Sequence, residues 1–330
     1  MMRVKVFLTV LLIAGLTLIA GCGQKTVAPG DNSPQQPKIK VLASVYPVYE
    51  FVRQVGGDKV EVTMLVPAGA EPHEWEPSAK DLVQVKNSKL FFYHGANLEH
   101  WLSKVTAKDV LGNTTAVEVS KDIELREGTA HTHDHDPAEE HKHNANEKQE
   151  PEKHQEVDPH VWLDPVLAQK EVNTIAEALA AADPANAVYY RDNATKYNEQ
   201  LQKLHSEYQD GLKTVQKRII VTSHAAFGYL GSRYNLEQVA IMGISPDAEP
   251  TPEKMADIVR MCRERQVTYL FAESIVSPKV AETLAKEAGA KVLLLHPIDS
   301  LTPDEIKQGK DYLTLMRENL ANLKLALSSN

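Results

Sequence analysis

The sequence predicts an α/β protein of two lobes, each with a central, mostly parallel sheet flanked by helices, joined by one long rigid helix. Three observations predict this architecture. A chain of 330 residues is longer than one hydrophobic core usually serves. Short β-branched runs alternate with helical patterns in two separate blocks, which is typical of parallel sheets covered on both faces. Between the blocks, no glycine or proline interrupts residues 185–210, which favours a single long helix.

The composition sets the class of protein. With 42% apolar and 25% charged residues, the chain has the composition of a soluble globular protein and enough apolar residues for a sizeable core. The formal net charge of -9 gives no reason to expect nucleic acid as a partner, and an acidic surface is compatible with cations.

The first segment has the pattern of a secretion signal. A short basic start is followed by the apolar run VFLTVLLIAGLTLIA and by small residues before Cys22. The ending LIAGC, residues 18–22, resembles a bacterial lipobox. That resemblance implies cleavage before Cys22 and a diacylglycerol on its thiol, an anchor that places the protein outside the cytoplasmic membrane, on its outer face. An ordinary signal peptide and a signal anchor are the alternatives.

We therefore expect residues 1–21 to be a lipoprotein signal peptide. Residues 22–38 are rich in Gly, Pro, Gln and Ser and are expected to form a flexible tether. Cys262 is then the only other thiol, so no intramolecular disulfide can form. Because Cys262 lies in a helical pattern, we expect it to pack in the core rather than to react.

The N-terminal lobe is expected over residues 39–183. The helix that follows the first strand should end at the Gly56-Gly57 pair. The β-branched runs predict strands and the 3.6-residue patterns predict helices in the following places. Strands are expected at residues 39–45, 60–66 and 89–95, and helices at 48–57, 78–88, 97–106 and from 166 onward.

The connecting helix is expected over residues 184–216. Asp183 is the predicted N-cap and Pro184 suits the first turn. At about 1.5 Å per residue, such a helix would span a small domain. The C-terminal lobe should then occupy residues 217–330. Strands are expected at 218–224, 236–243, 267–274 and 291–297, and helices at 252–266, 277–289 and 311–329.

Six of the 13 histidines lie in one acidic, almost wholly polar insert, at about residues 127–156. A segment with so little to bury cannot offset its conformational entropy, so we expect it to be disordered. Its clustered imidazoles can still bind zinc weakly, as an accessory site. The alternative is a solvated loop without a function. The insert histidines are His131, His133, His135, His141, His143 and His154.

Three isolated histidines lie where a fixed site is expected. His73 follows a predicted strand, in a loop stiffened by prolines, and His160 lies in the proline-fixed loop VDPHVWLDP. His224 stands at the carboxyl end of the first strand of the second block, where open α/β sheets bind ligands. Any one of them is as often structural as a ligand. Together they indicate a metal site.

An oxygen ligand is expected after the last strand, where His296 and Asp299 both lie. Three neutral imidazoles and one carboxylate suit tetrahedral Zn²⁺ better than Mn²⁺, whose sites usually carry more oxygen.

Several neighbouring side chains have two open interpretations. Glu71, Asp158 and Asp164 would either orient imidazole N–H groups or, for the two aspartates, only shape turns before proline. His94 and His100 flank a strand-to-helix turn, where a capping role competes evenly with ligation. His205 is expected to be an exposed helical residue. Trp75 and Trp162 are expected to shield and pack beside the ligands.

The motifs, in their order along the chain, resemble the metal-specific solute-binding proteins of bacterial ABC importers, and most of all the zinc-uptake members. They are the lipobox, PAGAEPHEWEPS, the His-rich insert, DPHVWLDP, the long helix, the TSHAAFGYLGSRYNLEQVAIMGISPDAEPTP stretch and LFAES. The resemblance covers essentially the whole chain from about residue 38. It implies two α/β lobes joined by one rigid helix, with the metal at their interface.

Carried over by matching motif, the resemblance implies His73, His160 and His224 as metal ligands. The manganese-type members have TSE where this chain has TSH, which favours zinc. It implies Asp299 as the fourth ligand, although water completes the shell in some zinc members, and it leaves His296 as a supporting or structural residue. Glu273, in FAES, resembles a recurrent position near the cleft without a certain role.

The resemblance implies a monomeric, high-affinity extracytoplasmic zinc receptor that delivers Zn²⁺ to an ABC-transporter permease and is not an enzyme. One alternative is a manganese- or iron-binding member of the same family with an adhesin role. Another is a zinc metallohydrolase, since three histidines and an open position also describe catalytic zinc. The chain lacks an HExxH pair, and an Asp299 ligand leaves no obvious place for activated water.

Overall fold

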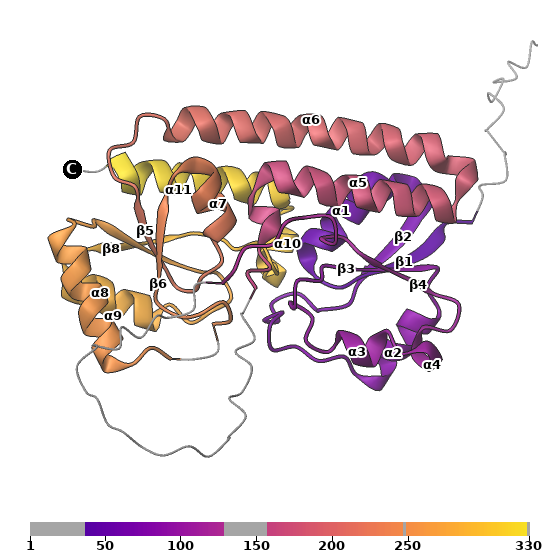
Figure 1. Cartoon of the computed structure of the whole chain (residues 1–330), viewed down its shortest axis with the longest axis horizontal. Coiled ribbons are helices and arrows are strands. Elements are labelled where there is room, and N and C mark those ends of the chain that lie inside the picture. Colours follow the sequence, from indigo (N-terminus) through magenta and orange to yellow (C-terminus); the bar gives the residue numbers. More distant parts are fainter. Residues whose placement is uncertain (1–36, 129–156, 247–248, 329–330) are drawn as a thin grey trace, which may run out of the picture. The chain divides into compact units, whose positions relative to one another are not determined.

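The computed structural model describes residues 37–128, 157–246 and 249–328. These residues form two four-stranded sheets, and every strand pair in both sheets is parallel (Figure 1). Helices flank the sheets, so the expected α/β fold in two lobes is confirmed. Among the described residues, no helix combines the length and apolarity needed to cross a membrane.

The sheet of the N-terminal lobe has the order β2-β1-β3-β4. Its strands are β1 (Ile39–Ala43), β2 (Val60–Met64), β3 (Leu90–Tyr93) and β4 (Thr115–Glu118). The last three residues of β1 are buried, as expected for a central strand covered on both faces. β4 is an edge strand that the sequence analysis missed.

The helices of this lobe are α1 (Tyr46–Gly56), α2 (Ala79–Lys86), α3 (Leu102–Val105), α4 (Lys108–Leu111) and α5 (Pro165–Ala182). As expected, α1 ends at the Gly56-Gly57 pair, where Gly57 has a φ of 51°. The helix expected over residues 97–106 is only α3. Ala96 and Asn97 have φ values of 51° and 63°, so the chain cannot enter a right-handed helix there.

The sheet of the C-terminal lobe has the order β6-β5-β7-β8, which repeats the topology of the first. Its strands are β5 (Ile219–Thr222), β6 (Glu237–Ala240), β7 (Tyr269–Ala272) and β8 (Lys291–Leu294). Its helices are α7 (Gly228–Tyr234), α8 (Pro252–Glu264), α9 (Lys279–Ala288), α10 (Pro303–Lys307) and α11 (Tyr312–Ser328).

The long helix α6 (Ala187–Leu212) is shorter than the expected span of 184–216, because residues 184–186 form a 3₁₀ turn. Asp183 does not cap it, contrary to expectation. Its carboxylate instead accepts hydrogen bonds from the Tyr190 hydroxyl at 2.8 Å and the Asn186 amide at 2.7 Å. These side-chain donors hold Asp183 away from the backbone N–H groups that a capping residue satisfies.

α6 joins the two lobes, since it packs against α1 and α5 toward one of its ends and against α7 and α11 toward the other (Figure 1). One hydrophobic core crosses it. The ring of Phe51 from α1 lies 6.0 Å from that of Tyr197 in α6 and 5.1 Å from that of Tyr312 in α11. Because this core of buried rings includes residues of both lobes, we expect the connection between the lobes to be stiff.

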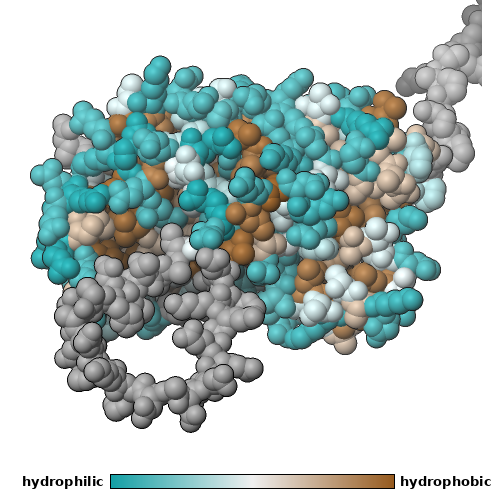
Figure 2. Space-filling view, viewed as in Figure 1, coloured by the Kyte–Doolittle hydropathy of each residue, from teal (hydrophilic) through white to brown (hydrophobic). Residues whose placement is uncertain are grey.

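The surface of the described residues is mostly polar. In Figure 2, hydrophilic side chains cover most of the visible face and apolar side chains show in small patches between them. The large apolar side chains that are exposed come from well-separated places in the chain, such as Val83, Val188 and Ile306. Isolated apolar residues of this kind are normal on a soluble surface.

Candidate metal centre

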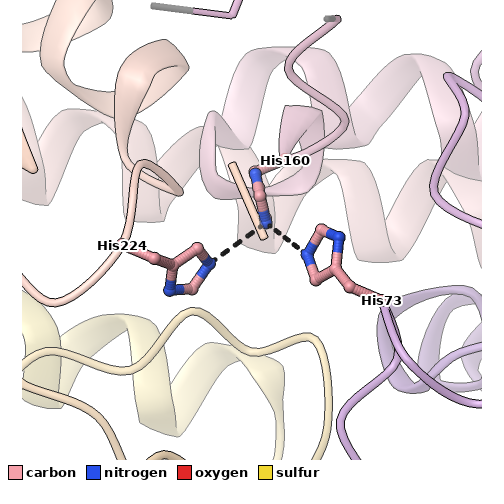
Figure 3. A group of neighbouring side chains, drawn as sticks. All are labelled: His73, His160 and His224. Carbon is pink, nitrogen blue, oxygen red and sulfur yellow. Dashed lines mark hydrogen bonds between the residues drawn. The ribbon is translucent and has the colours of Figure 1, made fainter. Parts of the chain in front are cut away.

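Three imidazole rings point toward one another where the lobes meet (Figure 3). The Nε2 atom of His160 lies 3.3 Å from Nε2 of His73 and 3.4 Å from Nε2 of His224. A set of ligand atoms from these three residues lies within 4.8 Å of one another. The sequence analysis singled out these three histidines, and the structure brings them together.

His73 comes from the loop after β2. The loop is tied to the other lobe by the Gly69 N–H, which donates to the Leu301 carbonyl at 2.8 Å. Gly69 has a φ of 79°, which glycine adopts without strain. The His73 N–H donates to Glu71 Oε1 at 3.1 Å. These bonds fix the approach of the His73 ring.

His160 lies just before a 3₁₀ turn that leads into α5. Asp158 Oδ1 accepts the His160 backbone N–H at 3.0 Å and lies 2.9 Å from Nδ1 of the ring. Since a carboxylate only accepts, this contact places the proton on Nδ1 and leaves the Nε2 lone pair facing the other histidines. Burial raises the pKa of Asp158 to about 7. Gly228 is required here, because a Cβ would collide with Asp158.

His224 follows β5 and is fully buried. Its Nδ1 lies 2.7 Å from both oxygens of Glu273, and Glu273 also accepts the His224 backbone N–H at 3.1 Å. Burial alone would lower the pKa of His224, but the Glu273 carboxylate raises it to about 9. As for His160, a carboxylate on Nδ1 orients Nε2 toward the centre of the group.

The charge state of the other two rings favours a cation. Burial, together with the neighbouring imidazoles, holds the pKa values of His73 and His160 well below the usual range. Both rings are therefore neutral near pH 7, and a neutral ring offers the lone pair that binds a metal.

Two carboxylates lie beside His73. Asp299 is 1% exposed; its Oδ1 accepts the Ser300 N–H at 2.7 Å, whereas Oδ2 has no hydrogen-bond partner within the described residues. Glu71 Oε2 is likewise buried without a partner in that part of the chain. Burial raises the pKa of both carboxyl groups, and the charge of the nearby His224 ring offsets only part of that effect.

Ligand atoms of Glu71, His73 and Asp299 also lie within 4.8 Å of one another, so His73 belongs to two candidate groups. Three imidazole nitrogens with an adjacent carboxylate oxygen are the donor set that tetrahedral Zn²⁺ takes in proteins. The orphaned oxygens and converging nitrogens therefore fit a zinc ion. Sequence reasoning gave Glu71 only a supporting role and missed it as a candidate ligand.

Asp158 and Asp164 have different roles. Asp158 orients an imidazole, whereas Asp164 shapes its turn and forms an ion pair. It accepts the Val166 N–H at the start of α5 at 2.9 Å and lies 2.7 Å from Arg233. Glu273 orients His224. The sequence feature that could have predicted this role is the position of Glu273 directly after β7, because β7 pairs with β5, and His224 follows β5.

The remaining histidines lie apart from the group. The Nδ1 of His296 accepts the Ile298 N–H at 2.9 Å and its Nε2 lies 3.0 Å from the Ser274 hydroxyl, so both ring nitrogens are engaged. His94 is buried 3.1 Å from Glu171, and His100 lies 3.7 Å from Glu76 near the surface. His205 is half-buried against the Tyr234 hydroxyl at 3.1 Å, contrary to the expected exposure.

Two tryptophans pack beside the ligands. Trp162 contacts His160 at 5.3 Å between ring centroids and donates its indole N–H to the Pro297 carbonyl at 2.8 Å. Trp75 packs edge-on against Trp101. Cys262 is buried in a core cluster, and burial raises the pKa of its thiol to about 11. Cys22 and the six insert histidines lie outside the described residues.

Several known proteins are similar to this chain in sequence and fold. A family model for the periplasmic component A of the zinc-uptake complex matches residues 41–326. The high-affinity zinc uptake system protein ZnuA of Bacillus subtilis is 38% identical over 310 residues, 94% of each chain. The zinc-binding protein AdcA of Streptococcus pyogenes is 39% identical over 288 residues, 87% of this chain; the chain spans 56% of that relative's length.

Among solved structures, the Zn(II)-bound ZnuA-like domain of Streptococcus pneumoniae AdcA superposes with a TM-score of 0.73. It is 36% identical in sequence, and the match covers 89% of this chain and 100% of that domain. A likeness of this extent reaches both lobes and the long helix between them.

Proposed function

The chain belongs to the family of the periplasmic component A of zinc-uptake complexes, and we propose that it captures Zn²⁺ outside the cytoplasmic membrane and delivers it to an ABC-transporter permease. Zinc-uptake and zinc-binding relatives at 38% and 39% identity support this function. Cys22 would carry the lipid that holds the protein at the membrane surface, and the insert histidines would collect zinc weakly.

One observation carries the proposal: the Nε2 atoms of His73 and His224 lie within 3.4 Å of His160 Nε2, and carboxylates contact the Nδ1 atoms of His160 and His224. Metal-bound histidines usually need such partners, which fix the tautomer and raise ligand basicity. His73, His160 and His224 would bind Zn²⁺ through nitrogen and Asp299 through oxygen. Ligands from both lobes would then be joined by one ion.

Capture and release would need only a small movement of the lobes. The ligands lie in loops at the ends of strands, whereas the lobes share a core of packed rings around α6. Disrupting that core to open the lobes widely would cost many apolar contacts. We therefore expect small-angle scattering of the apo and zinc-bound protein to give nearly the same profile, and a large closure would contradict this.

Competition titration with a zinc chelator tests the function. The wild-type apo protein should bind one Zn²⁺ tightly, and His224→Ala should weaken that binding by more than about 100-fold, since even loss of a supporting partner costs about 10–100-fold. His205→Ala, a histidine away from the group, is the matched control. Retention of the tight site in His224→Ala and His73→Ala would refute the assignment, as would metal-dependent hydrolytic turnover.

A further inference from the structure

Beside the three-histidine group lies a second set of ligand atoms, which shares His73 with that group and also contains Asp299, the proposed fourth ligand. We propose that Glu71, His73 and Asp299 form an outer position for the divalent cation, through which the ion passes on its way to and from the three-histidine position. This inference rests on the proposed zinc-binding function and adds a route to it.

The outer position has unused donors. Glu71 Oε2 and Asp299 Oδ2 are both buried and have no hydrogen-bond partner within the described residues. An oxygen of each carboxylate can reach a cation together with His73, because ligand atoms of the three residues lie within 4.8 Å of one another. A buried carboxylate oxygen without a partner is costly, and a bound cation removes that cost.

Burial gives the two positions an order. His160 and His224 are 0% exposed and Asp299 is 1% exposed, whereas His73 and Glu71 are only half-buried. An ion that arrives from solvent therefore meets Glu71 and His73 before it reaches the inner two rings. Because His73 belongs to both groups and Asp299 is the proposed fourth ligand, the ion would keep these two ligands while His160 and His224 replace Glu71.

The outer position is assembled without movement of the lobes. The loop that carries Glu71 is bound to the loop that carries Asp299 through the Gly69 N–H, at 2.8 Å from the Leu301 carbonyl. The Tyr46 N–H of α1 also donates to the Asp299 carbonyl, at 3.3 Å. These bonds hold the two carboxylates in place across the lobes, so the ion finds them already arranged.

A residue that contacts the ion only between solvent and the final position changes the rates in both directions and leaves the equilibrium unchanged. Glu71→Gln keeps the size of the side chain and the fold of the loop but removes its charge. In stopped-flow mixing of Zn²⁺ with apo protein, and of loaded protein with chelator, the association and dissociation rates should both fall by about tenfold. The dissociation constant should stay within about twofold, since equal changes in both rates cancel.

Glu74→Gln is the matched control, because it removes the same charge from the same loop at an exposed side chain. It should leave both rates nearly unchanged at physiological ionic strength. Equal slowing by the two variants would mean general electrostatic attraction and would overturn the proposal. A loss of affinity in Glu71→Gln with an unchanged association rate would make Glu71 a ligand of a single site, which would also overturn it.

A second experiment isolates the outer position. His160→Ala removes an inner ligand and leaves Glu71, His73 and Asp299 in place, so weak binding of one Zn²⁺ should remain. Adding Glu71→Gln should abolish this residual binding, whereas adding Glu74→Gln should not. Residual binding that ignores Glu71 would refute the outer position. If the wild type binds no zinc tightly, the proposed function itself has failed, and that outcome is separate from these.

Discussion

The two sheets have the same strand order, yet the carboxyl ends of their strands carry different chemistry. In the N-terminal lobe one carboxylate accepts hydrogen bonds from the groups that follow β1 and β3. Glu99 accepts the Ser44 hydroxyl at 2.6 Å and the N–H groups of His94 and Gly95 at 2.8 and 2.9 Å. In the C-terminal lobe the corresponding ends place His224 and Asp299 at the three-histidine group, with Glu273 behind His224.

The difference shows that topology alone does not make a binding edge. Both sheets present strand ends to the space between the lobes, but only donors left free by their neighbours can bind an ion. The N-terminal lobe supplies its candidate ligands from loops away from the ends of β1 and β3: His73 after β2 and His160 before α5. The strand ends of the N-terminal lobe thus form a closed edge, and those of the C-terminal lobe form an open edge.

The largest effect should come from replacing each of two buried histidines with alanine, His224 after β5 and His94 after β3. His224→Ala should lose the tight zinc site. His94→Ala should keep it but lower the free energy of unfolding of the apo protein by about 3–5 kcal/mol, because Glu171 would be left buried without its partner. Zinc titration and urea unfolding of both variants check this. A His94 variant that folds normally and loses zinc would contradict the contrast.

A smaller effect is expected from changing the carboxylates that accept hydrogen bonds at the strand ends, Glu273 and Glu99. Glu273→Gln keeps the shape but weakens the acceptor for His224 Nδ1, so zinc affinity should fall about 10–100-fold. Glu99→Gln, which changes the equivalent carboxylate of the closed edge, should leave zinc affinity unchanged. Isothermal titration of the two variants against the wild type measures the difference, and equal losses would show that the edges are not distinct.

Two tryptophans provide a matched pair for the contact between the lobes. Trp162→Phe removes the indole N–H that donates to the Pro297 carbonyl, and should lower the free energy of unfolding by about 1–3 kcal/mol. Trp101→Phe removes an indole N–H that has no partner within the described residues, so it should cost less. Denaturant unfolding of apo protein compares them. A larger loss in Trp101→Phe would contradict the assigned contact.

The smallest effect concerns acid stability near Asp299. Burial alone would raise the pKa of Glu305, but bonds from the His296 ring and from Thr302 lower it to about 2. Since the folded pKa lies below the ordinary value of 4.5, this group stabilises the fold above about pH 4.5, and the gain is lost as the pH falls toward 2. Unfolding midpoints at pH 6 and pH 3 should differ less in Glu305→Gln than in the wild type. An equal difference would refute the assignment.

Much of the fold followed from local patterns. The β-branched runs marked seven of the eight strands. The missed strand, β4, is a half-buried edge strand of four residues. The prediction of a helix over residues 97–106 was wrong for its first half, because Ala96 and Asn97 have positive φ values that helix propensity does not reveal. The family resemblance drawn from the motif order was confirmed by the family match.

The candidate site was predictable where position along the chain decides it. His73, His160 and His224 were found because strand ends and proline-fixed loops point to such places. The carboxylates that accompany these histidines were not predictable, because their contacts join residues that are distant in sequence. Glu273 contacts His224 from a neighbouring strand, and Glu71 lies near Asp299 of the other lobe. Asp158 and Asp164 have the same local sequence, Asp before Pro, and only the packed structure separates their roles.

The most direct test of the central claim is anomalous diffraction at the zinc edge from crystals of the protein loaded with one equivalent of Zn²⁺. The account predicts a single peak among the Nε2 atoms of His73, His160 and His224, within bonding distance of a carboxylate oxygen of Asp299. A peak that lies away from these three rings, or one carried only by the histidines of residues 131–154, would contradict it.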